Sequence, residues 1–165
     1  MIPEASHQPI LFEVIKNTKG SILELGAGES STRQIHKLAK GREILTIDDN
    51  QEWAFMYSGL KENHRFIYLK PSELYNYFKD DKNNWSVVLV DLSTSDERMI
   101  AIQNYSITSD YVIVHDSQSL NVAQFFKYWR QFSIKDHSDY PQTLLGSNYN
   151  DVSRFNIKGV IDYIR

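Results

Sequence analysis

The sequence contains no cysteine. Disulfides, thiolate metal sites and a cysteine nucleophile are therefore excluded, and a reducing compartment is expected. No stretch approaches the roughly 20 apolar residues that a membrane-spanning helix needs, and the first residues lack the basic and apolar regions of a secretory signal. We therefore expect a cytoplasmic protein that does not associate with a membrane.

Dense clusters of basic residues are also missing. The chain has 18 lysines and arginines against 21 aspartates and glutamates, with a net charge of -3. This balance does not favour nonspecific binding to a phosphate backbone. The G-x-x-x-x-G-K-[ST] and G-x-S-x-G motifs are absent, which argues against P-loop nucleotide hydrolysis and α/β-hydrolase chemistry. We expect a small-molecule substrate and no nucleic-acid partner, and we leave a homo-oligomer open.

Short apolar runs alternate with segments of helical period along the chain. We predict strands at 22–25, 43–47, 66–69, 87–91 and 111–115, with weaker ones at 143–146 and 159–164. Helices are predicted at 31–40, 52–60, 72–79, 96–105 and 120–132. This alternation is typical of a parallel sheet covered by helices. We therefore predict one minimal α/β domain over residues 1–165, with a doubly wound, mostly parallel sheet.

A glycine turn follows the first predicted strand, in the segment "ELGAGESS". Gly26 and Gly28 fall between strand and helix, where a doubly wound sheet opens onto its ligand crevice. Glycine there lets the backbone approach a ligand closely. With Ala27 between them and Ser31 at the start of the helix, these residues form a predicted cofactor-binding turn.

Two acids end the second predicted strand. Asp48 lies about 20 residues after Gly28, the spacing at which a carboxylate accepts hydrogen bonds from ribose hydroxyls, and Asp49 follows it. In a purely architectural alternative, the glycines only make a tight turn and the aspartates cap the next helix. Because strand, turn, helix and distal acid occur together, we favour a ribose-bearing ligand.

The residues around the turn discriminate between such ligands. A dinucleotide site expects Gly or Ala where this chain has Ser31, and the carboxylate of Glu24 would lie beside a pyrophosphate. A ligand with an ammonium or sulfonium group would instead be attracted by Glu24. S-adenosylmethionine has that layout. An NAD-linked oxidoreductase is disfavoured, although the fold alone does not exclude it.

At this point the sequence resembles a class I S-adenosylmethionine-dependent methyltransferase, in which an E/D-x-G-x-G turn follows the first strand and an acid ends the second. "ELGAG" at 24–28 and Asp48 match this pattern. The blocks "VVLVDLSTSDER", "SDYVIVHDSQ" and "PQTLLGSN" are similar, in the same order, to a bacterial methyltransferase-like group of poorly defined function. The resemblance implies a Rossmann-like methyltransferase fold and S-adenosylmethionine as the cofactor. It also places Glu73 near the adenine.

One departure from that group concerns the loop after the fourth predicted strand. Asp91, Leu92 and Ser93 stand where the group often has aspartate followed by glycine. The loop beside the transferred methyl group is therefore expected to have a different shape.

Three polar groups end strands at the same predicted edge of the sheet, namely Asp91, His115 and Asp116, and we predict catalytic roles for them. His115 is mostly neutral at pH 7 and could take a proton from a hydroxyl or amine. In the structural alternative, its ring only bonds to backbone and Asp116 caps a turn or helix. A resemblance to catechol-type O-methyltransferases would imply a divalent cation on Asp91 and Asp116, but two oxygens are too few and we predict no metal.

The other histidines, His7, His36, His64 and His137, show no metal-ligand spacing, so we interpret them as polar surface. The sequence thus predicts an S-adenosylmethionine-dependent methyltransferase acting on a small hydroxyl- or amine-bearing acceptor. The alternatives are a non-catalytic module or subunit that binds S-adenosylmethionine or a nucleoside, and an NAD-linked oxidoreductase.

Overall fold

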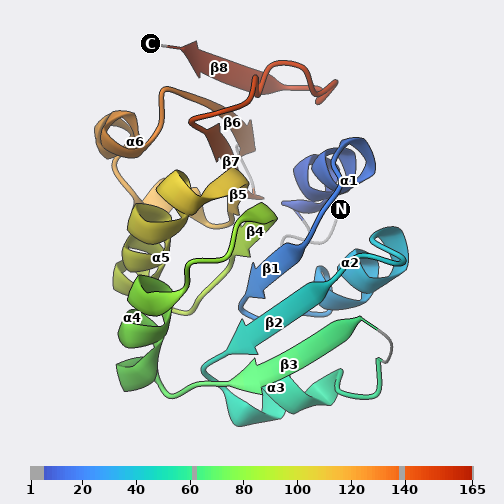
Figure 1. Ribbon diagram of the computed structural model, residues 1–165. Helices are drawn as coiled ribbons and strands as arrows, with labels where there is room; N and C mark the ends of the chain where they lie inside the picture. Colours follow the sequence, from blue (N-terminus) through green and yellow to red (C-terminus); the bar gives the residue numbers. More distant parts are fainter. Residues whose placement is uncertain (1–5, 61–62, 138–139, 165) are drawn as a thin grey trace.

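The computed structural model describes residues 6–60, 63–137 and 140–164 (Figure 1). Within these residues, eight strands form one sheet in the order β3-β2-β1-β4-β5-β7-β6-β8. The strands are β1 (Ile22–Leu25), β2 (Ile44–Asp48), β3 (His64–Tyr68), β4 (Trp85–Val90), β5 (Ser109–Val114), β6 (Gln131–His137), β7 (Tyr140–Ser147) and β8 (Val160–Ile164). The helices are α1 (Gln8–Asn17), α2 (Thr32–Leu38), α3 (Gln51–Met56), α4 (Pro71–Asp80), α5 (Ser95–Thr108) and α6 (Val122–Tyr128), with a short 3-10 helix at Ser117–Ser119.

The sheet is parallel in one half and antiparallel in the other. β3, β2, β1, β4 and β5 are parallel neighbours, as predicted. β7, β6 and β8 continue the sheet in antiparallel pairs. The α/β class and the parallel half are confirmed, whereas the three C-terminal strands show that the parallel order does not extend through the whole sheet.

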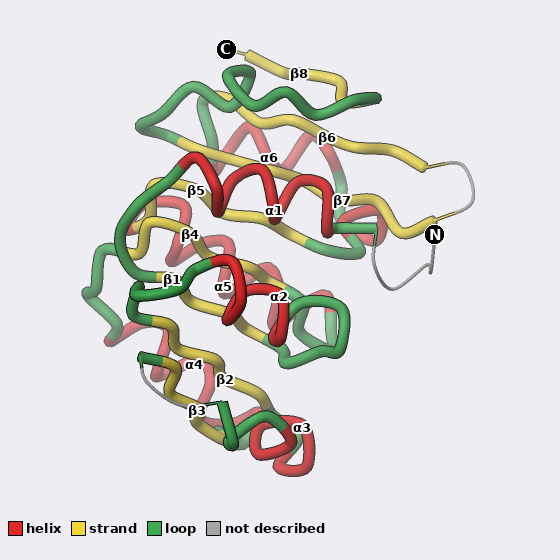
Figure 2. Tube along the Cα trace, turned by 90° about the vertical axis from the view of Figure 1, so that its right-hand side faces the viewer, coloured by secondary structure: helices red, strands yellow, loops and turns green. Residues whose placement is uncertain are grey.

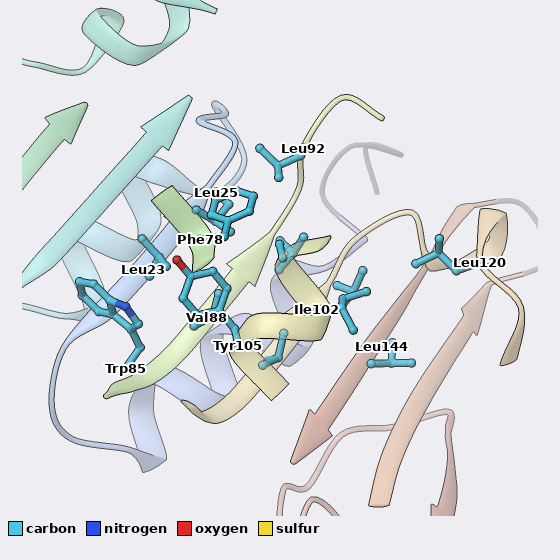
Figure 3. Close-up of a cluster of buried hydrophobic side chains, with 14 of the residues drawn as sticks. Leu23, Leu25, Phe78, Trp85, Val88, Leu92, Ile102, Tyr105, Leu120 and Leu144 are labelled. Atoms are coloured by element: carbon cyan, nitrogen blue, oxygen red, sulfur yellow. The ribbon is translucent and has the colours of Figure 1, made fainter. Parts of the chain in front are cut away.

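Helices cover both faces of the sheet, so the β1, β2 and β4 strands are buried throughout. On one face α4, α5 and α6 pack on alternate strand residues such as Leu23, Leu25 and Val88 (Figure 3). On the other face α1 and α2 pack on residues such as Ile22 and Val87. Figure 1 shows these two groups of helices on opposite sides of the sheet, and Figure 2 shows α1 and α2 in front of the strands with α4, α5 and α6 behind them. This arrangement is doubly wound, as predicted.

The sequence analysis missed two elements, α1 and β6, and predicted one helix that is too long. Helix α1 precedes the first strand, and its residues Ile10, Leu11 and Val14 are fully buried. The predicted helix at 120–132 is too long, because α6 ends at Tyr128 and β6 begins at Gln131. The chain turns at Arg130, whose N–H donates to Asn148 Oδ1 at 2.9 Å. This contact with a distant residue is not visible in the local pattern of aromatic residues.

Candidate functional site

The carboxyl ends of the central strands gather the residues that the sequence singled out. The sheet hydrogen bonds continue into the residues that follow each strand: Gly26 N–H donates to Ile47 O at 2.8 Å and Asp91 N–H to Leu25 O at 2.7 Å. His115 N–H donates to Val90 O at 3.0 Å in the same way. The residues that follow β1, β2, β4 and β5 therefore lie close together at one edge of the sheet, as expected.

The glycine turn contains two glycines with different structural roles. Gly26 has φ +93°, and a Cβ atom there would lie 2.2 Å from the carbonyl oxygen of Asp91. Only glycine fits this contact. A Cβ atom on Gly28 would meet only Ser31 Oγ, at the ordinary distance of 3.4 Å. The fold thus requires Gly26 but leaves the space beside Gly28 open.

Glu24 lies beneath the turn and is completely buried. Its Oε1 accepts a hydrogen bond from Thr32 Oγ1 at 3.1 Å, and its Oε2 accepts one from Thr46 Oγ1 at 2.7 Å. Thr32 Oγ1 in turn accepts the Gly28 N–H at 2.9 Å, so Glu24 is linked to the turn through Thr32. Burial raises the pKa of Glu24 to about 7. Glu24 therefore supports the turn from below and does not line either of the cavities beside it.

Asp48 joins the glycine turn to the start of α3. Its Oδ2 accepts the Ala27 N–H at 2.6 Å and its Oδ1 accepts the Asn50 N–H at 2.7 Å. Burial raises the pKa of Asp48, and the neighbouring charges of Asp49 and Asp91 act in the same direction. Carboxylate oxygens retain lone pairs after one hydrogen bond each, so Asp48 can still accept ribose hydroxyls.

Two adjoining cavities flank the turn, and we refer to them together as the cleft. The first has a volume of about 180 Å³, and Gly26, Ala27, Asp48 and Asp49 contribute to its wall. The second has about 500 Å³, and its lining includes Gly28, Ser31, His115 and Asp116. Trp53 and Asp91 line both. The cleft thus contains the predicted site residues apart from Glu24 and Glu73.

His115 is held between two partners. Its Nδ1 lies 2.9 Å from Asp91 Oδ1, and its Nε2 lies 3.0 Å from Ser6 Oγ. Burial opposes the charged form of His115, but the hydrogen bond and charge of Asp91 outweigh it and raise the pKa. For Asp91, burial alone would raise the pKa, but the hydrogen bond and charge of His115 lower it. The ring is therefore bonded to side chains, not to backbone as the structural alternative supposed.

Asp116 follows directly and has an unusual backbone. Its φ is +53°, the only positive value among the non-glycine residues that the structure describes. Its Oδ2 lies 3.3 Å from Arg98 Nη2. Strained backbone of this kind is concentrated at functional sites.

Two residues of this region were not found by the sequence analysis. Ser6 and His7 precede α1, and both are buried, with exposed fractions of 0% and 1%. His64 is also buried, at 6%, so the interpretation of His7 and His64 as polar surface was wrong. The apolar pattern of α1 is the one signal that could have indicated that this segment docks on the sheet.

Other predicted contacts lie elsewhere. Glu73 is exposed and caps α4, with its Oε2 accepting the Lys70 N–H at 2.8 Å, and it is not among the residues of the cleft. The aromatic residue Trp129 is 1% exposed and packs in the core beside Phe125. The aromatic residue Trp53, in contrast, lines the cleft.

Comparison with known proteins places this geometry in a fold family. No protein-family profile and no curated sequence matches the chain. Among solved structures, an rRNA methylase from Streptococcus thermophilus superposes with a TM-score of 0.61 at 12% identity, covering 91% of this chain and 99% of the other. The bifunctional kinase–methyltransferase WbdD gives 0.65 at 14% identity, covering 87% and 40%.

The 16S rRNA N2 G1207 methyltransferase RsmC of T. thermophilus, solved with S-adenosylmethionine and guanosine, gives a TM-score of 0.62 at 12% identity, covering 87% and 41%. The chain thus spans about two-fifths of WbdD and RsmC. Because two of these three proteins are named as rRNA enzymes, the fold lends no support to the expectation that nucleic acid is not a partner. No helix in the described part is long and apolar enough to cross a membrane. The protein has the fold of the class I S-adenosylmethionine-dependent methyltransferases.

Proposed function

We propose that the chain is a methyltransferase that binds S-adenosylmethionine in the cleft beside the glycine turn. The observation that carries this proposal is the open backbone at Gly28 next to the buried acid Asp48, at the switch point where β1 lies between β2 and β4. In open α/β sheets, ligands bind at this place. RsmC shares the fold and was solved with S-adenosylmethionine.

The charges of the cleft favour this cofactor over a dinucleotide. Asp48, Asp49 and Asp91 contribute carboxylates to its walls, and a pyrophosphate would be repelled by them, whereas a sulfonium and an ammonium would be attracted. The backbone of Gly26, Ala27 and Gly28 would contact the methionine part and Asp48 the ribose. Glu24 would act indirectly, by holding the turn through Thr32.

The acceptor would bind in the larger cavity, next to His115. A volume of about 500 Å³ suits a small molecule. The acidic wall and the net charge of -3 disfavour a phosphate-rich acceptor such as RNA. We propose a small hydroxyl- or amine-bearing acceptor whose proton is taken up by the cluster of His115, Asp91 and Asp116. Alignment of acceptor, methyl group and sulfur would provide much of the rate.

Calorimetric titration of the purified chain with S-adenosylmethionine, S-adenosylhomocysteine and NADH tests the cofactor. We expect micromolar binding of the first two and none of NADH, with loss of binding in Asp48→Ala. Asp110→Ala, which removes an exposed acid at the start of β5, is the control and should bind as the unmodified chain does. Absence of binding to folded protein, verified by circular dichroism, would overturn the proposal, and tight NADH binding would favour an oxidoreductase.

A non-catalytic binding module predicts the same titration but no turnover. A screen with S-adenosylmethionine and small catechols, phenols and amines separates the two functions. Formation of S-adenosylhomocysteine that depends on the acceptor supports the enzyme. Cofactor binding that is unchanged in His115→Ala and Asp116→Ala, together with no turnover on any acceptor, would support the module.

A further inference from the structure

His7 is a buried imidazole whose hydrogen-bonding groups are unused. It is 1% exposed, and neither Nδ1 nor Nε2 makes a hydrogen bond of normal geometry among the described residues, although the Ser30 backbone lies near enough to act on its pKa. A buried polar group without a partner costs free energy. Since His7 lines the larger cavity of the cleft, a ligand in that cavity could satisfy it.

The neighbours of His7 are themselves good ligands for a metal ion. One donor atom each of His7, Asp91 and His115 lies within 4.8 Å of the other two. The His7 and His115 rings are 4.6 Å apart between centroids, at an angle of 75°. All three residues line the same cavity, so an ion could reach them from the cleft.

We propose that His7, Asp91 and His115 bind a divalent transition-metal ion of the Zn²⁺ type. Two imidazoles and one carboxylate form a donor set that Zn²⁺ and its neighbours in the first transition row prefer, and three protein ligands leave positions open for a substrate. Mg²⁺ prefers oxygen ligands. This site differs from the acidic pair considered from the sequence, because Asp116 is paired with Arg98 and His7 takes part.

The surroundings of His115 fit coordination through Nδ1. Metal–ligand bonds of about 2.0 Å at angles of 90–109° place donor atoms roughly 3 Å apart, and His115 Nδ1 and Asp91 Oδ1 are 2.9 Å apart. With the metal on Nδ1, the ring proton would reside on Nε2. This N–H would donate a hydrogen bond to Ser6 Oγ, which lies 3.0 Å from Nε2. Metal-bound histidines commonly donate their other N–H to such a partner, which fixes the ring orientation.

The role of the ion rests on the proposed function, although its binding does not. An ion on this wall would bind the acceptor hydroxyl and lower its pKa, and the hydroxyl proton would be released to water in the open cavity. The ion would then activate the acceptor hydroxyl in place of His115, which is proposed to take up its proton in the metal-free protein. The acceptor would then be a hydroxyl compound able to reach the open coordination positions.

Zn²⁺ and Mg²⁺ titrations of the full chain without a histidine tag, together with elemental analysis after dialysis, test the site. We expect one Zn²⁺ per chain and far weaker Mg²⁺ binding. His7→Gln, Asp91→Asn and His115→Gln should each weaken Zn²⁺ binding at least about 100-fold, and Ser6→Ala about 10–100-fold, as for other second-sphere partners. His36→Gln, which changes a histidine outside the cluster, should leave it intact.

Each variant is first tested for folding by circular dichroism, and His7→Gln and His115→Gln are also tested for S-adenosylhomocysteine binding without metal, so that loss of structure and loss of the metal ligand are separated. Zn²⁺ binding that does not depend on His7, absence of stoichiometric Zn²⁺, or Mg²⁺ binding as tight as that of Zn²⁺ would overturn the proposal. If S-adenosylhomocysteine binds but Zn²⁺ does not, the methyltransferase proposal stands and the metal site fails. If Zn²⁺ binds but S-adenosylhomocysteine does not, the metal site stands and the methyltransferase proposal fails.

Discussion

Gly26 and Gly28 are the same residue type two positions apart, but the fold needs only one of them. At Gly26 the positive φ and the nearby carbonyl of Asp91 exclude any side chain. At Gly28 neither constraint applies. A glycine that the fold does not require, on the wall of a cleft, is explained by close approach of a ligand to the backbone.

We therefore expect Gly28→Ala to fold normally and to lose affinity for S-adenosylhomocysteine. Its free energy of unfolding should stay within about 0.5 kcal/mol of the unmodified chain, because the added Cβ atom makes only ordinary contacts. Gly26→Ala should instead lose about 2–5 kcal/mol through backbone strain and a steric clash. Urea unfolding and calorimetry measure both effects. Unchanged affinity in Gly28→Ala would show that the cofactor backbone contact lies elsewhere.

Glu24 makes the stability of the protein depend on pH. Its pKa is about 7 in the folded protein, against 4.5 without burial, so the folded state holds a proton that the unfolded chain releases. This stabilisation is complete below pH 4.5 and is lost as the pH rises through 7. The difference amounts to about 3 kcal/mol.

Glu24→Gln retains the shape of the protonated side chain, with an NH₂ donor in place of the O–H, but has no proton that titrates. Between pH 5 and pH 8 the variant should therefore gain up to about 3 kcal/mol in unfolding free energy relative to the unmodified chain. Urea unfolding at several pH values measures this difference. A difference that stays constant over this range would contradict the raised pKa.

At the scale of the elements, a small residue on β7 determines how α6 packs. A Cβ atom on Gly146 would lie 2.4 Å from Cδ2 of Trp129, whose ring is in the core. Gly146→Ala should therefore destabilise the protein by about 1–3 kcal/mol through overpacking. Gly59→Ala is the matched control, because a Cβ atom there meets nothing within 4 Å. Thermal unfolding compares the two, and equal effects would contradict this account of the packing.

The elements differ in how well the sequence predicts them. The parallel strands were predicted because each contains a short apolar run, and their boundaries differ from the predicted ones by only one or two residues. The first two residues of β6 were taken for the end of a helix, because Phe132 follows closely on the aromatic residues of α6, and the rest of this strand was not predicted. Its identity as a strand depends on pairing with β7 and β8, which come later in the chain. Local periodicity contains no information about that pairing.

At the scale of the whole molecule, the cleft lies at the switch point between β1 and β4, where the two halves of the parallel sheet meet. Because the cofactor would bind only the folded protein, its binding should stabilise the entire fold. At a free concentration of S-adenosylhomocysteine about 100 times its dissociation constant, linkage predicts about 2.7 kcal/mol of added stability. For a chain of this size this corresponds to an increase of roughly 5–10 °C in melting temperature. Thermal unfolding with and without ligand measures it. Gly28→Ala should show little of this increase, and an equal increase in that variant would contradict the assigned position of the cofactor.

The sequence by itself determined the parallel half of the sheet, the glycine turn and the meeting of Asp48, Asp91 and His115 at one edge. These follow from local periodicity and from the rule that parallel strands bring their carboxyl ends together. Only the tertiary structure decided that Glu24 is buried beneath the turn, that the last strands run antiparallel, and that Ser6 reaches His115 across 109 residues of sequence. Such contacts arise from the docking of one segment on another, and no spacing along the chain encodes them.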